Sequence, residues 1–227
     1  FKTNLFGKIV YPDSSFNIKM NDLKMQLLGS PNTFFDTTYI WSRFVEISPP
    51  IEGKLITQPF FLKPYLIPFN KEVQLNIAID EKYSKKNIGI YYFNQKTFKW
   101  NYLPSIIVQD SLYIKTSILS GEIFAVIEEN NPPKLSNLLP NINGTYYSSD
   151  INHISLNISD SFSGLEGERD VIIKLNDKPV IFEYNSYQNK IRYPLKYNLK
   201  KGEHTLYVKA SDRVGNKSII KGNFFIK

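Results

Sequence analysis

The stretch Glu72-Val-Gln-Leu-Asn-Ile-Ala-Ile79 decides the fold class, because its large apolar residues occupy every second position. Successive side chains of a β-strand point to opposite faces, so its valine, leucine and isoleucine residues would share one face. A helix would need a period of 3.6 residues to gather them on one side. The stretch therefore predicts a strand that packs one face against a core.

The same alternation recurs along most of the chain, at intervals typical of a β-sandwich. The composition agrees, because the 227 residues include 15 tyrosines and 16 phenylalanines but only three alanines. The segment 23–28 is the one helix candidate, and it is too short to distinguish from an edge strand. We therefore expect an all-β chain of antiparallel β-sandwiches. Strands are predicted at 8–11, 39–47, 72–79, 88–93, 98–103, 112–115, 123–127, 153–158, 171–175, 180–184, 190–193, 205–210 and 219–226.

A polar run that ends in Pro132-Pro133 divides the alternating segments into two groups. Proline fixes its own backbone torsion and pushes the preceding residue out of the helical region, so this run is typical of a stiff linker. The sequence therefore predicts two domains, 1–130 and 131–227. The chain begins at Phe1 and carries no signal-like segment, so we expect it to be the C-terminal piece of a longer polypeptide.

Composition excludes several classes of chemistry. The chain has no cysteine, which excludes disulfides, thiolate nucleophiles and cysteine-bound metals. It has two histidines, so a zinc site with several histidine ligands would need both of them. No run approaches 18 apolar residues, and no membrane-spanning helix is predicted. The net charge is +7, but the lysines are dispersed and only four arginines occur, so we expect no nucleic-acid partner.

A series of short motifs recurs along the chain, at 32–40, 65–69, 73–79, 88–93, 99–103, 121–125, 160–165, 171–177, 201–206 and 210–216. In this combination the chain resembles the paired β-sandwich region that follows the catalytic domain in lysostaphin-type (murein endopeptidase-like) metallopeptidases of bacteria. Its second half alone resembles bacterial immunoglobulin-like repeats. The resemblance implies that the family's zinc ligands belong to a catalytic domain that this chain does not contain.

The resemblance implies a non-catalytic accessory module of an exported protein in the periplasm, at the outer membrane or on the cell surface. Such a module would position a neighbouring peptidase domain of the same polypeptide, or dock on a protein or a cell-wall glycan. Two other classes stay open. One is a structural adhesin or surface-layer subunit. The other is a hydrolase that uses loop carboxylates for acid–base catalysis.

The densest acidic loop offers a candidate metal site. Asp160, Glu166, Glu168 and Asp170 lie within eleven residues that also contain two glycines. Calcium takes six to eight oxygen ligands, so these four carboxylates are the candidate ligands for Ca²⁺, the one cofactor considered. The alternative is a turn in which Asp160 accepts hydrogen bonds from nearby backbone amides. No EF-hand spacing is present.

Two further polar features are predicted to be structural. Asp212-Arg-Val-Gly-Asn-Lys217 reads as a hairpin turn, with Asp212 bonding the turn amides and Gly215-Asn216 at positive φ. His153 and His204 each stand alone within a strand pattern, without the nearby nucleophile motif that a catalytic triad would need.

An aromatic hairpin is the candidate binding surface of the first domain. The strands 88–93 and 98–103 alternate aromatic residues, and we expect one aromatic row to face solvent while the other packs inside. Phe98, Trp100 and Tyr102 would share one face, and burial of that face is favoured because it is too large to leave wet. Exposed rings would stack on sugars or bind a protein. The candidate residues are Tyr91, Phe93, Trp100 and Tyr102.

Overall fold

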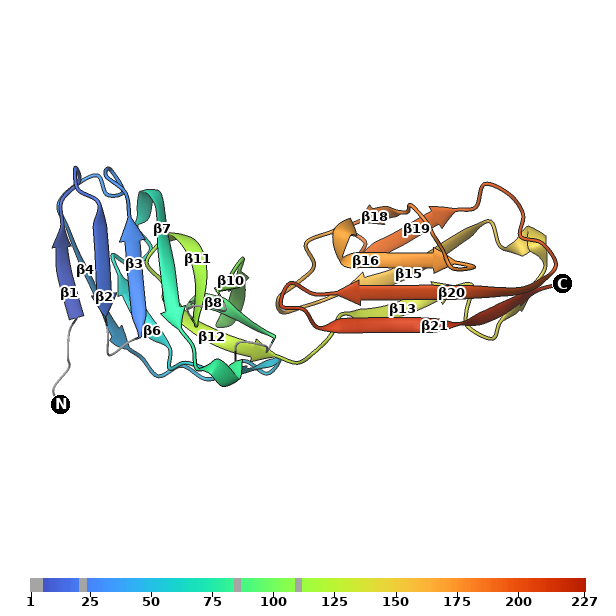
Figure 1. Ribbon diagram of the computed structural model, residues 1–227, viewed down its shortest axis with the longest axis horizontal. Helices are drawn as coiled ribbons and strands as arrows, with labels where there is room; N and C mark the ends of the chain where they lie inside the picture. Colours follow the sequence, from blue (N-terminus) through green and yellow to red (C-terminus); the bar gives the residue numbers. More distant parts are fainter. Residues whose placement is uncertain (1–5, 21–23, 84–86, 109–111) are drawn as a thin grey trace. The chain divides into compact units, whose positions relative to one another are not determined.

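The computed structural model describes residues 6–20, 24–83, 87–108 and 112–227 (Figure 1). Its regular secondary structure consists almost entirely of β-strands, which confirms the predicted all-β class. The helical turns in these ranges are three 3₁₀ turns of three residues each, Glu81–Tyr83, Ser148–Asp150 and Glu168–Asp170. None of the described helices is long and apolar enough to cross a membrane. Contacts divide the chain into two compact units, Phe1–Asn130 and Asn131–Lys227.

The first unit is a sandwich of two antiparallel sheets. One sheet has the order β1-β4-β6-β12-β8-β9, with β5 also paired to β12. The other has the order β10-β11-β7-β3-β2. The strands are β1 (Phe6–Val10), β2 (Phe16–Met20), β3 (Met25–Gly29), β4 (Thr38–Phe44), β5 (Gly53–Leu55), β6 (Phe60–Lys63), β7 (Pro68–Ala78), β8 (Ile88–Asn94), β9 (Lys99–Leu103), β10 (Ile106–Val108), β11 (Tyr113–Ser120) and β12 (Ile123–Glu129).

Strand β7 places the alternating stretch in the centre of its sheet. Val73, Leu75 and Ile77 belong to the main core cluster of the unit, and Leu75 and Ile77 are fully buried. The segment 25–29, which overlaps the helix candidate, is the strand β3 beside β7. It forms a strand because its alternate residues Met25 and Leu27 enter the same core. Tertiary packing therefore overrides the ambiguous local pattern.

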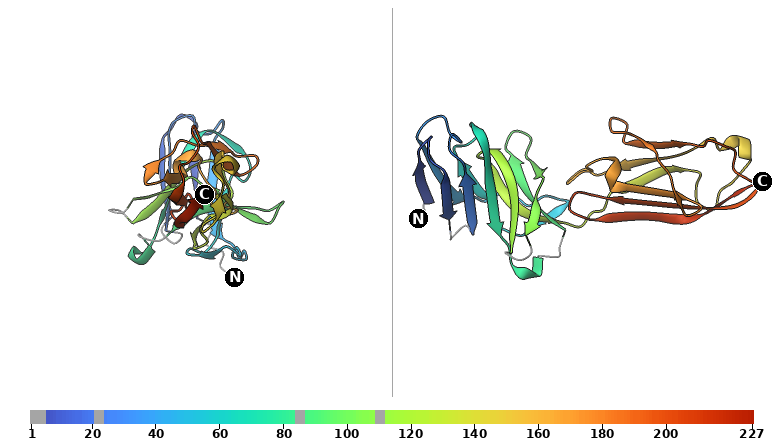
Figure 2. Two further views of the ribbon diagram at one scale, coloured as in Figure 1. Left: turned by 90° about the vertical axis from the view of Figure 1, so that its right-hand side faces the viewer. Right: turned by 45° about the horizontal axis from the view of Figure 1, so that its top comes forward.

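The second unit has the sheet orders β13-β15-β19-β18 and β14-β21-β20-β16-β17. In chain order these correspond to the A-B-E-D sheet and to a sheet containing the C, F and G strands of an immunoglobulin-type sandwich, as expected. Figure 2 shows the same strands from two further sides. The strands are β13 (Lys134–Leu139), β14 (Thr145–Tyr146), β15 (His153–Ser159), β16 (Val171–Leu175), β17 (Lys178–Pro179), β18 (Glu183–Asn185), β19 (Lys190–Pro194), β20 (Gly202–Ser211) and β21 (Lys217–Ile226).

The predicted strand 180–184 is wrong. The chain there leaves one sheet and enters the other, because β17 pairs with β16 while β18 pairs with β19. A segment that changes sheets cannot keep one continuous ladder, so its alternation does not become a single strand. The two sheets enclose a core of their own, in which Leu156, Val208 and Phe224 are fully buried.

Candidate functional site

The aromatic hairpin of β8 and β9 forms a buried cluster. Tyr91 pairs with Tyr102, and Phe93 pairs with Trp100, so the four candidate residues share one face of their sheet. Tyr91, Phe93 and Trp100 are buried, and Tyr102 is half-buried. The three buried rings therefore offer no exposed face to a ligand in this structure.

Polar contacts hold the two rings of β9. The indole N–H of Trp100 donates to the carbonyl oxygen of Ser48 at 3.2 Å, and the Tyr102 hydroxyl accepts from the backbone N–H of Ser105 at 3.3 Å. The Phe93 and Trp100 ring centroids lie 5.3 Å apart. The favoured burial of Trp100 agrees with the structure, because its polar edge has a backbone partner and its apolar face has another ring.

The expectation that one aromatic row would face solvent is wrong. Ile88 and Ile90, on the opposite face of β8 from Tyr91 and Phe93, are also buried and belong to the core cluster. Strand β8 is thus covered on both faces. Phe98 does not join Trp100, because it lies in the turn before β9 with φ at 56° and is 78% exposed.

The acidic loop is a pair of hydrogen-bonded turns. Asp160 Oδ1 accepts the backbone N–H groups of Phe162 and Gly164 at 3.1 and 2.6 Å, and Gly164 has a φ of 77°. Asp170 Oδ2 accepts the backbone N–H groups of Glu166 and Gly167. These contacts agree with the alternative prediction, in which the loop is a turn whose aspartates accept hydrogen bonds from backbone amides.

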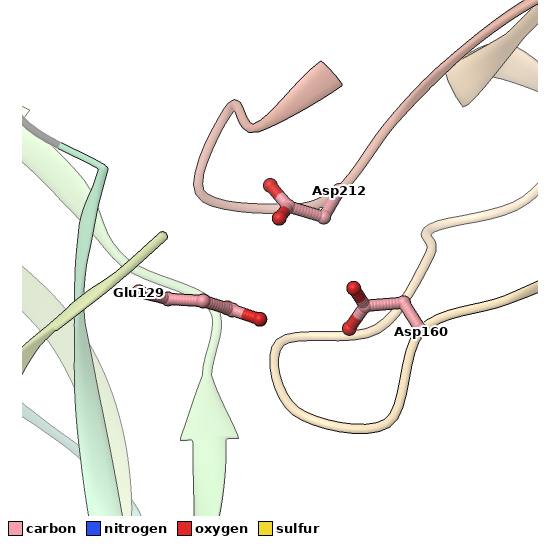
Figure 3. A group of neighbouring side chains, drawn as sticks. All are labelled: Glu129, Asp160 and Asp212. Carbon is pink, nitrogen blue, oxygen red and sulfur yellow. The ribbon is translucent and has the colours of Figure 1, made fainter. Parts of the chain in front are cut away.

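The structure does not gather the four predicted calcium ligands. Within the described ranges, no group of three or more neighbouring carboxylates contains Glu166, Glu168 or Asp170. Asp160 instead has Asp212 as its neighbour, with carboxylate oxygens within 4.8 Å, and Figure 3 draws both side chains on loops of the second unit. The two loops are joined by a hydrogen bond from the Arg213 N–H to the Gly164 carbonyl oxygen at 3.2 Å. The pair of Asp160 and Asp212 was not predicted, because the two residues lie far apart along the chain.

Asp212 caps its own turn, as predicted. Its Oδ1 accepts the backbone N–H groups of Val214 and Asn216 at 3.0 and 2.8 Å, and its Oδ2 accepts the Asn216 side chain at 2.7 Å. Gly215 has a φ of 98°, while Asn216, expected at positive φ as well, does not. Burial raises the pKa of Asp212 above its usual value; hydrogen bonds from Asn216 oppose this rise, and the charge of Asp160 adds to it.

We expect the stability of the second unit to decrease as the pH rises through the raised pKa of Asp212. Above the reference value of 3.8, the folded state binds this proton more tightly than the unfolded state, so ionisation favours unfolding. Urea unfolding of the wild type and Asp212→Asn, from about pH 3 to about pH 7, measures the effect. The free energy of unfolding of the wild type minus that of the variant should fall with pH.

The Asp160→Asn variant is the control for this titration. It removes the like charge beside Asp212, so the pH-dependent decrease should become smaller. A difference between wild type and Asp212→Asn that is constant or grows with pH would contradict the expected direction.

The two histidines have structural contacts. His204 is buried and its ring stacks on Phe224, with centroids 5.4 Å apart. Its Nδ1 lies 2.9 Å from the Asn176 amide nitrogen, and its Nε2 lies 2.7 Å from the Lys200 carbonyl oxygen. A neutral ring that accepts at Nδ1 and donates at Nε2 satisfies both contacts. For His153, burial lowers the pKa, and the charges of Arg192 and Lys190 add to that effect.

A row of side-chain amides on the outer face of the first unit was not predicted from the sequence. Gln74 Nε2 donates to Asn76 Oδ1 at 2.8 Å, and Asn76 Nδ2 donates to Gln26 Oε1 at 3.1 Å. Gln26 Nε2 donates in turn to Asn17 Oδ1 at 2.9 Å. These four residues, from the neighbouring strands β7, β3 and β2, are the amide face.

The amide face borders an open surface depression. Polar side chains from strands β2, β7 and β11 line much of it. Glutamine and asparagine at the outward positions of the stretch 72–79 were the one signal of this face in the sequence. Their hydrogen-bond partners lie on β2 and β3, two strands that the alternating pattern did not identify. The polar lining residues are Ser15, Asn17, Ser30, Glu72, Gln74 and Ser117.

Comparisons with known proteins leave the chain without an assigned family. No family model and no curated protein matches it. A solved structure, dimeric latent PorU from Porphyromonas gingivalis, is similar over 69% of this chain at 11% identity, with a TM-score of 0.31. The match spans 22% of the PorU chain. A similarity at this level carries no conclusion about function.

Proposed function

We propose that this chain is a non-catalytic binding module of an exported bacterial protein, and that its first unit binds a neutral, hydroxyl-rich glycan on the amide face. The observation that carries the proposal is the chain of three hydrogen bonds that links Gln74, Asn76, Gln26 and Asn17 across three strands. These hydrogen bonds hold the four side-chain amide groups in defined orientations on one sheet.

Amides suit hydroxyl groups because both kinds of group donate and accept hydrogen bonds. Each side-chain amide has two donor hydrogens and two acceptor lone pairs, and each bond of the chain uses one donor and one acceptor. Asn17 is exposed and Gln74 is half-buried, and both line the depression. Gln26 is half-buried, and Asn76 is buried between Gln26 and Gln74, to which it is hydrogen-bonded. Groups held in place lose less conformational freedom when a ligand binds.

Several features support a binding role in place of catalysis. Asp160, Asp170 and Asp212 accept hydrogen bonds from turn amides, and His204 is enclosed by two polar partners and a ring. These groups stabilise local structure. The exported setting, the location at the cell envelope and the proximity of a peptidase domain remain part of this proposal, and the sequence resemblance supports them.

We expect Gln26→Ala/Gln74→Ala to lose most of its glycan binding. Affinity electrophoresis in gels of the neutral polymers β-glucan, xylan or mannan measures retention of the purified chain. Two lost hydrogen bonds at about 1 kcal/mol each correspond to a roughly tenfold or larger loss of affinity. Asn101→Ala removes an amide from β9, outside the amide face, and should bind like the wild type.

Unchanged retention of the double variant, or no retention of the wild type by any of these polymers, would contradict glycan binding on the amide face. Thermal unfolding of both variants separates loss of binding from loss of folding. Ordered assembly of the concentrated protein without a glycan would support the structural-subunit alternative.

A further inference from the structure

A second surface, independent of the amide face, lies on the outer side of the sheet β14-β21-β20-β16-β17. The inward residues of β20, such as Leu206 and Val208, are fully buried, so Tyr207 and Lys209 point outward between them. Four lysines lie on this outer side of the second unit and form what we call the lysine face. They are Lys174, Lys209, Lys217 and Lys221.

The strand register sets the spacing of these lysines. Lys174 and Lys221 both pair with Tyr207, from β16 and β21, and form one row across three strands. Lys209 occupies the next outward position of β20, between Ile172 and Ile219. Neighbouring strands are about 4.8 Å apart, and alternate residues of one strand are about 6.8 Å apart. The Cα atoms of Lys174, Lys209 and Lys221 therefore lie within roughly 12 Å of one another.

The lysine face carries an uncompensated positive charge. Within the described ranges, none of its four ammonium groups has a carboxylate within ion-pair distance. Glu203 lies at one end of the sheet and accepts from the Asn223 side chain at 2.7 Å. Residues 131–227 contain 14 basic and 9 acidic side chains, a net +5.

Apolar and aromatic groups lie between the charges. Lys174 Nζ sits 5.8 Å from the centroid of the Tyr207 ring, which holds this lysine over the sheet. Ile172 and Ile219 are 43% and 57% exposed in the row beside it. The surface therefore alternates cations with partly exposed apolar and aromatic side chains.

We propose that the lysine face binds an acidic polysaccharide, a polymer with carboxylate, phosphate or sulfate groups on its sugar rings. Charge complementarity carries the choice of an anionic partner. The repeating alternation of anions and C–H faces in such a polymer matches the alternation of lysines with isoleucine and tyrosine on the sheet. Lysine acts as a point charge, and the face has none of the arginines that usually read nucleic acids.

The test uses the full chain with polygalacturonate and dextran sulfate as probes and neutral dextran as the uncharged control. Isothermal titration at low salt should show binding to the acidic polymers, with an affinity that falls as salt is added. The variant Lys174→Gln/Lys209→Gln/Lys221→Gln should weaken this binding at least tenfold. The variant Lys134→Gln/Lys190→Gln/Lys196→Gln has the same net charge and should change it less than about twofold.

Equal weakening by both triple variants would overturn the lysine face as a site, because total charge alone would then explain binding. Tighter binding of duplex DNA, or of vesicles containing phosphatidylglycerol, would overturn the acidic polysaccharide as its partner. The amide-face variant Gln26→Ala/Gln74→Ala should bind the acidic polymers like the wild type. Its behaviour separates failure of this inference from failure of the glycan proposal for the first unit.

Discussion

Replacing Trp100 by alanine is expected to destabilise the first unit by about 3–5 kcal/mol, the usual cost of truncating a buried aromatic residue. Trp100 is 7% exposed, packs on the Phe93 ring and donates to the Ser48 carbonyl oxygen. The substitution leaves a cavity beside Phe93 and removes the donor for a backbone acceptor. The melting temperature of this unit should fall by something on the order of 10 °C.

Phe98→Ala is the matched control, because this aromatic neighbour of Trp100 in the chain is 78% exposed. Its expected effect is below about 0.5 kcal/mol. Fluorescence of Trp41 follows unfolding in both variants, since it remains when Trp100 is removed. If the two variants melt together, Trp100 does not belong to a tightly packed cluster.

Phe224→Ala is expected to destabilise the second unit by a similar amount, about 3–5 kcal/mol. The Phe224 side chain is fully buried between the sheets and stacks on His204. The first unit has a separate core cluster, and both tryptophans of the chain, Trp41 and Trp100, lie in the first unit. Far-ultraviolet circular dichroism should therefore detect an early transition that tryptophan fluorescence does not report.

Phe225→Ala provides the control for this experiment. Phe225 is the next residue of β21, but it points to the other face and is 44% exposed, so its truncation should cost far less. A tryptophan transition that shifts together with the dichroism in Phe224→Ala would mean that the two units unfold as one cooperative system.

The contacts of the candidate sites could be predicted from the sequence only where the residues lie close together along the chain. The turn of Asp212 was predictable, because its partners Val214 and Asn216 lie within four residues. The proximity of Asp160 to Asp212 was not, because more than fifty residues separate them. The amide face was missed for the same reason, since Gln26 and Asn76 meet only through the pairing of β3 with β7.

The period of two determined much of this protein without any tertiary information. It indicated strands wherever alternate residues are apolar, and residues such as Leu75, Leu156 and Leu206 enter the cores for that reason. Periodicity names two faces of a strand but not what covers each one. Only the tertiary structure decided that β8 is buried on both faces and that Trp100 of the neighbouring strand β9 contacts the Ser48 backbone. The reason is that burial depends on which distant segment of the chain packs against the sheet.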